Sequence, residues 1–230
     1  MRQVTIADGR GRRRDILAGV AFESSGGLPP AWSAALCHLP RRGRVLDYGS
    51  WQGLAALWLA AATEARVTFA HFSATLLAQV GRNARASSLR LTCRAMFPLE
   101  GAWDTLVLAA PEQSEALAML AAQGAARLAP GGELLVVDGP LRRESLARAF
   151  TRVEVLAQEE GWSLARCTGP RSGEGLPWRR LAFDLGDLEL EMASLPGTFS
   201  PQGLDLGSRV LLETAVIPPG GRVLDLGCGW

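Results

Sequence analysis

GRVLDYG, at residues 43–49, recurs almost unchanged as GRVLDLG at residues 221–227. The two segments share six of seven residues and lie 178 residues apart. A solenoid repeat is shorter, about 20–50 residues, whereas this spacing suits one copy of a whole domain. We therefore expect a duplicated domain whose first strand and following glycine turn occur twice.

Between the two segments, short apolar stretches alternate with helix-like stretches. The pattern predicts strands at 44–47, 66–70, 89–93, 105–109 and 133–137, edge strands at 153–156 and 163–167, and helices at 54–62, 74–84, 114–128 and 141–150. The proline and glycines at 129–132 are expected to close the third of these helices. Such alternation is typical of an α/β fold with a doubly wound, mostly parallel, Rossmann-like sheet.

The stretch TGPRSGEG at residues 168–175 predicts a linker. We assign residues 1–167 to a first domain, 168–178 to the linker and 179–230 to the beginning of a second domain. In this second domain we expect a β-hairpin of strands 181–184 and 188–192, a helix over 204–215 and a first strand from Arg222. The sequence stops at Trp230, where the second glycine turn begins, so we expect this domain to be truncated.

Composition narrows the class of protein. Hydrophobic residues make up 48% and charged residues 20% of the chain, which is ordinary for a globular protein. No apolar run approaches the roughly 20 residues of a membrane-spanning helix, and the start lacks a signal-peptide core, so we expect a cytoplasmic protein without membrane contact. The cysteines are far apart and neither histidine has a neighbour at ligand spacing, so we expect no metal.

Arginine supplies every fixed positive side-chain charge, because the chain contains no lysine. The formal net charge of +1 does not by itself indicate a nucleic-acid binder. Two clusters stand out, at residues 10–14 and 41–44. Contacts to RNA phosphates are one interpretation. A solvated charged end is the other, and the one we favour from sequence.

The second glycine turn indicates a ligand site. In an open parallel sheet, ligands bind beyond the carboxyl ends of the strands. A glycine turn there lets a ligand approach the backbone, and the next helix offers free N–H groups. Asp225-Leu226-Gly227-Cys228-Gly229 has this form. Taken alone, D-x-G-x-G also occurs in nicotinamide- and flavin-binding proteins and in turns that bind nothing.

The surrounding residues are more specific. VLDLGCG, at 223–229, resembles the first motif of class I S-adenosylmethionine-dependent methyltransferases. Together with LPGTFS at 195–200 and GLDLGS at 203–208, the run 195–230 resembles the entry to the catalytic domain of the small-subunit ribosomal RNA guanine-N2 methyltransferases, which contain a methyltransferase small domain. The resemblance implies a tandem-domain enzyme whose second domain binds S-adenosylmethionine and methylates the exocyclic amine of a guanine.

The same resemblance implies these cofactor-binding residues: Phe199, Ser200, Asp205, Asp225, Gly227 and Gly229. Gly227 and Gly229 would border the methionine and ribose portions of the cofactor, and Asp225 would order the loop and face the amino group. The other three would line the entrance. No catalytic residue is assigned, because the Asn-Pro-Pro-Phe-type motif of the family is expected beyond Trp230.

The first domain departs from the family pattern at three functional places. Trp51 stands where the second domain has Gly229, and His71 stands where an acidic residue for the ribose is expected. Ala109-Ala110-Pro111-Glu112 replaces the Asn-Pro-Pro motif. These departures predict a degenerate domain that has kept the fold and lost the chemistry.

Several functions remain open from sequence. We favour a monomeric methyltransferase acting on ribosomal RNA or the small ribosomal subunit, and we expect the chain as given to be inactive alone. The alternative is a non-catalytic, RNA-binding or scaffolding pseudo-methyltransferase module. A third hypothesis makes the first domain itself active with unusual ligands. A dinucleotide-dependent oxidoreductase is disfavoured, because both loops lack the G-x-G-x-x-G spacing.

Overall fold

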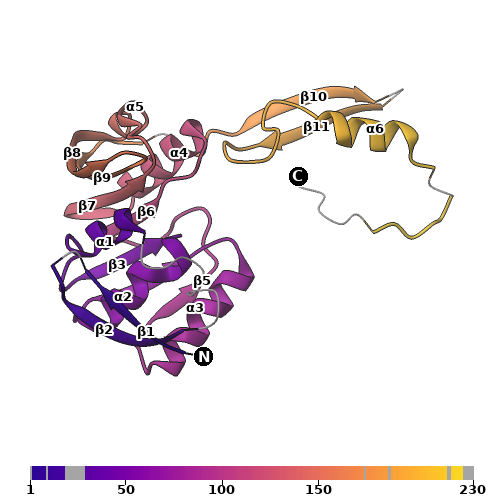
Figure 1. The fold of residues 1–230 in the computed structure, drawn as a ribbon. Coiled ribbons are helices and arrows are strands. Elements are labelled where there is room, and N and C mark those ends of the chain that lie inside the picture. The colour runs from indigo at the N-terminus through magenta and orange to yellow at the C-terminus, as the bar shows by residue number, and fades with distance from the viewer. Residues whose placement is uncertain are drawn as a thin grey trace. The chain divides into compact units, whose positions relative to one another are not determined.

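The computed structural model describes residues 2–8, 10–18, 29–173, 175–185, 188–216 and 219–224 (Figure 1). The chain divides into two compact units, Met1–Gly173 and Glu174–Trp230. The division falls within the predicted linker 168–178. However, Thr168 and Pro170 belong to the last strand of the first unit, because they pair with Arg152 and Phe150. The assignment of the two units as duplicated domains stays a prediction.

The first unit contains most of the secondary structure. Its elements are β1 (Arg2–Ala7), β2 (Arg13–Ala18), α1 (Pro30–Leu36), β3 (Arg44–Tyr48), η2 (Trp51–Gly53), α2 (Leu54–Ala62), β4 (Arg66–Ala70), α3 (Ala74–Ala86), β5 (Thr92–Arg94), β6 (Trp103–Ala109), α4 (Ser114–Ala125), β7 (Leu128–Asp138), α5 (Arg143–Ala147), β8 (Phe150–Glu159) and β9 (Trp162–Pro170).

Seven of these strands form one sheet in the order β5-β4-β3-β6-β7-β9-β8. The strands from β5 to β7 are parallel, whereas β9 runs antiparallel to both β7 and β8. The predicted doubly wound, mostly parallel sheet is confirmed. Within this sheet the first strand along the chain is β3. The chain then continues outward through β4 to β5 and returns to β6 on the other side of β3. The order therefore reverses between β3 and β6, which is where sheets of this class bind ligands.

Helices cover both faces of the sheet. Buried residues of α1, α2 and α3 pack with Val45, Val67 and Val107 in one hydrophobic core. On the other face, α4 lies against the sheet so closely that a Cβ at Gly124 would be 3.5 Å from Leu106. Apolar strands covered on both sides explain why their sequences read as continuous hydrophobic runs.

An amino-terminal hairpin of β1 and β2 was not predicted. It contacts α2 and α3 (Figure 1), and its Ile6 and Ile16 are buried in the core. The alternation of apolar residues around Ile6 and Ile16 was the available signal, but the arginines between them suggested a solvated end. This cover also explains why Leu54–Ala62, predicted as a helix with these bounds, is apolar on all sides.

Two predicted helices are shorter than expected. The helix predicted over 114–128 ends at Ala125, because β7 begins at Leu128 and includes the residues 129–132 that we expected to be a plain turn. Gly132 allows this, since a Cβ there would lie 2.9 Å from the carbonyl oxygen of Ala129. The helix predicted over 141–150 is only Arg143–Ala147, because the buried Phe150 begins β8.

The second unit contains β10 (Arg179–Leu185), β11 (Leu188–Ser194) and α6 (Leu206–Thr214). The antiparallel pairing of β10 with β11 confirms the predicted hairpin, whose turn residues 186 and 187 lie outside the described residues. The strand expected from Arg222 is not formed over the described residues 219–224, where Val223 and Leu224 are exposed. A lone strand cannot satisfy its backbone groups, and no neighbouring parallel strand is present in the described part of this unit.

None of the helices over the described residues is both long and apolar enough to cross a bilayer.

Candidate functional site

The loop after β3 is the first place to look for a cofactor, because it follows the strand at which the sheet order reverses. Its acidic residue, Asp47, is completely buried. The Asp47 carboxylate accepts hydrogen bonds from the Ser50 backbone N–H (3.0 Å), the Ser50 hydroxyl (2.5 Å) and the Ala56 backbone N–H (2.8 Å). Burial raises the pKa of Asp47 to about 6, against the opposing effect of these hydrogen bonds. Asp47 therefore ties β3 to α2 and does not face a ligand.

The remainder of this loop is tightly wound. Trp51 begins the short helix η2, and its partly buried side chain packs against the hydrophobic core. Gln52 and Gly53 follow with φ values of +51° and +73°. Glycine is required at position 53, since a Cβ there would lie 2.5 Å from Cγ2 of Val80. The loop thus lies directly against α3.

Two aromatic residues, His71 and Phe72, follow the end of β4. Nδ1 of His71 accepts a hydrogen bond of 2.9 Å from the backbone N–H of Ser73, and its ring stacks on Phe72 with centroids 4.3 Å apart. Burial lowers the pKa of His71. A Cβ at Gly49 would lie 3.4 Å from Cδ2 of His71. The histidine therefore stands beside the glycine turn, at the place where the resemblance implies an acidic residue for the ribose.

The ends of β6 and β7 are joined by Arg142. Its guanidinium pairs with the buried Asp138, with N–O distances of 2.5 and 3.1 Å, and donates a 2.8 Å hydrogen bond to the carbonyl oxygen of Glu112. Glu112 belongs to the segment that replaces the Asn-Pro-Pro motif. Sequence reasoning did not single out Asp138 or Arg142. An Asp at the end of an apolar strand with an Arg four residues later was the signal that could have found them.

These contacts together decide whether the first unit fits S-adenosylmethionine. The buried Asp47 carboxylate faces α2, His71 stands where the resemblance implies an acidic residue for the ribose, and the guanidinium of Arg142 is paired. The side chains of Asp47, Asp138 and Arg142 are thus engaged within the chain and do not fit the cofactor; the degenerate character of the first domain stays a prediction.

The second unit contains the residues that the resemblance implies for the cofactor. Asp225, Gly227 and Gly229 lie outside the described residues. Phe199 is 72% exposed, and the Ser200 hydroxyl donates a 2.7 Å hydrogen bond to the carbonyl oxygen of Gly203. Thus the structure describes three of the six and does not test their role.

Asp205 is the N-cap of α6. Its carboxylate accepts hydrogen bonds from the backbone N–H groups of Gly207 (3.0 Å) and Ser208 (3.1 Å) and from the Ser208 hydroxyl (2.6 Å). These hydrogen bonds, above all that of the Ser208 hydroxyl, lower the pKa of Asp205. Asp205 therefore starts the helix, and any contact with a cofactor would be an additional role.

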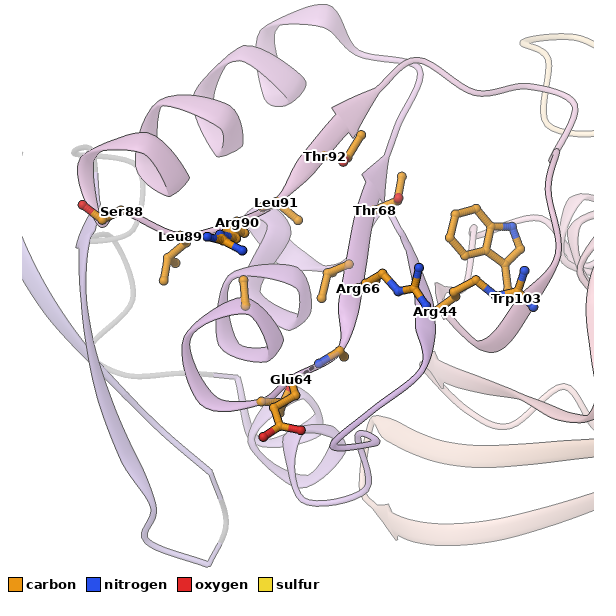
Figure 2. A pocket seen from close by; sticks show the side chains of 14 residues that line it. Arg44, Glu64, Arg66, Thr68, Ser88, Leu89, Arg90, Leu91, Thr92 and Trp103 are labelled. Atoms are coloured by element: carbon orange, nitrogen blue, oxygen red, sulfur yellow. Dashed lines mark hydrogen bonds between the residues drawn. The ribbon is translucent and has the colours of Figure 1, made fainter.

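The structure brings the two arginine clusters of the sequence together. Arg12 and Arg14 line one groove with Arg41 and Arg42. A larger groove of about 790 Å³ adjoins it, at the amino ends of β3, β4 and β6 (Figure 2). Both grooves lie near the amino ends of the strands, whereas the loop after β3 lies at their carboxyl ends. No group of three or more histidine, cysteine, aspartate or glutamate side chains suited to a metal ion occurs among the described residues.

Comparison with known proteins supports the resemblance. Residues 189–230 match the methyltransferase small domain family. The ribosomal RNA small subunit methyltransferase C of Pseudomonas aeruginosa (strain LESB58) is 36% identical over 137 residues, which are 56% of this chain and 41% of that protein. The Stutzerimonas stutzeri (strain A1501) protein of the same name is 38% identical over 141 residues, 57% of this chain and 42% of that protein. The chain spans about two fifths of the length of these curated relatives.

Solved structures agree on the fold. The T. Thermophilus 16S rRNA N2 G1207 methyltransferase (RsmC), determined in complex with AdoMet and guanosine, superposes with a TM-score of 0.63 at 24% identity over 92% of this chain and 57% of that chain. The ribosomal protein L11 methylase of Lactobacillus delbrueckii subsp. bulgaricus gives a TM-score of 0.53 at 13% identity over 66% of this chain and 92% of that chain. The expected family resemblance is therefore confirmed: the chain is similar to the small-subunit ribosomal RNA methyltransferase C proteins, and its residues 189–230 match a methyltransferase small domain.

Proposed function

We propose that this chain belongs to an S-adenosylmethionine-dependent enzyme that methylates the exocyclic amine of a guanine in ribosomal RNA, in the cytoplasm. The proposal rests on two features that occur in one chain. The first unit has a methyltransferase-type sheet whose cofactor loop uses its polar groups internally, and residues 189–230 match the methyltransferase small domain. The internally engaged polar groups of the first loop and the second glycine-rich motif of the sequence support the assignment of cofactor binding to residues 179–230 and of architecture to residues 1–167.

In this proposal the second unit holds the cofactor. Gly227 and Gly229 let the ligand approach the backbone, Asp225 faces its amino group, and Phe199, Ser200 and Asp205 line the entrance. The cofactor supplies an electrophilic methyl group. The contribution of the chain is to bind and orient, since alignment of two reactants provides much of the acceleration in such transfers.

A matched pair of variants tests the assignment of roles. The chain would be extended after Trp230 with the rest of the methyltransferase small domain of the P. aeruginosa relative, and tritium transfer from labelled S-adenosylmethionine to ribosomal RNA would be measured. Asp225→Asn should reduce transfer by about 100-fold, comparable to a misplacement of about 1 Å. The equivalent change in the first loop, Asp47→Asn, should leave transfer unchanged in protein that is verified as folded.

Two other outcomes of this experiment would contradict the proposal. Loss of transfer in Asp47→Asn but not in Asp225→Asn would assign the chemistry to the first unit. No transfer from the unsubstituted extended protein, under conditions where the whole P. aeruginosa relative is active, would contradict the proposal and favour the non-catalytic scaffold.

A further inference from the structure

A group of arginines lies at the amino ends of the central strands, around the two adjoining grooves. We call it the arginine surface, and it consists of Arg12, Arg14, Arg41, Arg42, Arg44, Arg66 and Arg90. The grooves adjoin because Thr63 and Glu64, at the end of α2, line both of them. Their volumes are about 790 and 330 Å³.

Carboxylates neutralise only part of this surface. Arg12 pairs with Asp8 at 2.6 Å, Arg42 pairs with Glu64 at 3.1 Å, and Arg44 pairs with Asp104 at 3.5 Å. Three of the seven positive charges are thus matched, which leaves an excess of four. Because the formal net charge of the whole chain is only +1, this excess is a local concentration of positive charge.

The unmatched arginines differ in how they are held. Arg14 donates hydrogen bonds to the backbone carbonyls of Ala61 (3.3 Å) and Arg13 (2.9 Å). Arg41, Arg66 and Arg90 are exposed, and none of their guanidinium groups pairs with a carboxylate among the described residues. Figure 2 shows Arg66 and Arg90 on the larger groove, together with Arg44. The side chains of Arg41, Arg66 and Arg90 are therefore available to an external anion.

The chemistry of the grooves favours phosphates. Guanidinium groups bind phosphate oxygens in a two-pronged geometry. The larger groove is also lined by the hydroxyl-bearing residues Thr68, Ser88 and Thr92. Hydroxyl groups are common partners of phosphate and sugar oxygens. The arginines come from several segments and spread over two grooves, so they fit an extended polyanion better than one small anion.

We propose that the arginine surface binds the phosphodiester backbone of an RNA strand, with Arg41, Arg66 and Arg90 as its principal phosphate contacts. This inference rests on the proposed function, because it assumes that RNA is the substrate class. It assigns RNA docking to the first unit, at the edge of the sheet opposite to the closed cofactor loop. Binding there requires no cofactor.

Salt dependence of binding provides the test. The affinity of the 230-residue chain for a fluorescent single-stranded RNA would be measured by fluorescence anisotropy between about 50 and 200 mM salt. The variant Arg41→Gln/Arg66→Gln/Arg90→Gln should bind more weakly, and its plot of log affinity against log salt should be shallower by about 2, since each phosphate contact on a single strand contributes about 0.7.

A matched control removes three charges elsewhere. Arg82, Arg148 and Arg152 are exposed, line neither groove and have no ion pair among the described residues. The variant Arg82→Gln/Arg148→Gln/Arg152→Gln should retain the slope of the unsubstituted chain. Equal slopes for the two triple variants, or no RNA binding by the unsubstituted chain at about 50 mM salt, would overturn the inference. Methyl transfer by the extended protein is measured separately, so a failure of this inference can be distinguished from a failure of the proposed function.

Discussion

The carboxylate of Asp47, at the end of the central strand β3, accepts a 2.8 Å hydrogen bond from the backbone N–H of Ala56 in α2. In a working cofactor loop of this class we would expect the corresponding acidic residue to face the ligand. Here it fastens the loop to the helix that follows. This contact has consequences that can be measured.

The stability of the protein should fall as the pH rises through the titration range of Asp47. The folded-state pKa is raised from 3.8 to about 6, so the folded protein retains a proton that the unfolded chain releases. The resulting stability is present below about pH 4 and is lost by about pH 6. Relative to Asp47→Asn, the free energy of unfolding of the unsubstituted chain should drop by about 3 kcal/mol across this window. Denaturant titrations of both proteins would show it, and parallel pH profiles would contradict it.

A comparison of alanine substitutions at two glycines distinguishes the cost of a steric clash from the cost of backbone strain. Gly53 and Gly131 have φ values of +73° and +77°, but a Cβ at Gly53 would lie 2.5 Å from Val80, whereas nothing lies within 4 Å at Gly131. Both alanine variants incur the cost of a left-handed backbone. Gly53→Ala should lose about 1–3 kcal/mol more in unfolding free energy, as overpacking does. Similar losses for both variants would mean that Val80 moves aside freely.

The His71 side chain should remain neutral at pH values somewhat below 6.5, the ordinary pKa of histidine. Its Nδ1 accepts the hydrogen bond of Ser73, so the ring proton belongs on Nε2, and burial lowers the pKa. A nitrogen-detected NMR titration should show this tautomer and a midpoint below 6.5, with the signal identified by its loss in His71→Gln. Stability contributed by the neutral ring is complete above pH 6.5 and declines as the pH falls toward the folded-state pKa. A midpoint at or above 6.5 would refute the assignment.

Replacing Arg142 alone should destabilise the protein more than replacing both members of its ion pair. Arg142→Met leaves the buried Asp138 carboxylate without its partner, and we expect a loss of about 3 kcal/mol in unfolding free energy. The double variant Asp138→Asn/Arg142→Met should regain part of that loss, because no unpaired charge is then buried. Thermal and denaturant melts of the single and double variants test this. If the double variant were less stable than Arg142→Met, the loss would not come from an unpaired carboxylate.

Local sequence patterns were sufficient for several of the regular elements. The apolar stretch Leu54–Ala62 forms the helix that was predicted, and the run at 105–109 lies within β6. These elements are determined by periodicity and by flanking glycines, which act over a few residues. The bounds that were wrong, such as the end of α4 at Ala125, depended on a distant strand, because β7 pairs with β6 from Leu128 onward.

The candidate site likewise has features that the sequence shows and features that only the structure shows. The repeated GRVLDxG segment and its likeness to a methyltransferase motif could be recognised from sequence. The role of residues 225–229 and the degenerate character of the first loop stay predictions. The direction of a side chain could not. Nothing local shows that Asp47 faces Ala56, or that Arg142 reaches the carbonyl of Glu112, 30 residues away.

The amino-acid sequence alone determined the fold class, the family resemblance and the segment that matches a methyltransferase small domain, because hydrophobic periodicity and short motifs are encoded by neighbouring residues. Only the tertiary structure decided that the first cofactor edge is closed and that Arg14 and Arg41 line one groove. The first outcome depends on how the end of β3 meets α2, and the second on how β2, α2 and the start of β3 pack together. Packing joins residues that the sequence keeps far apart.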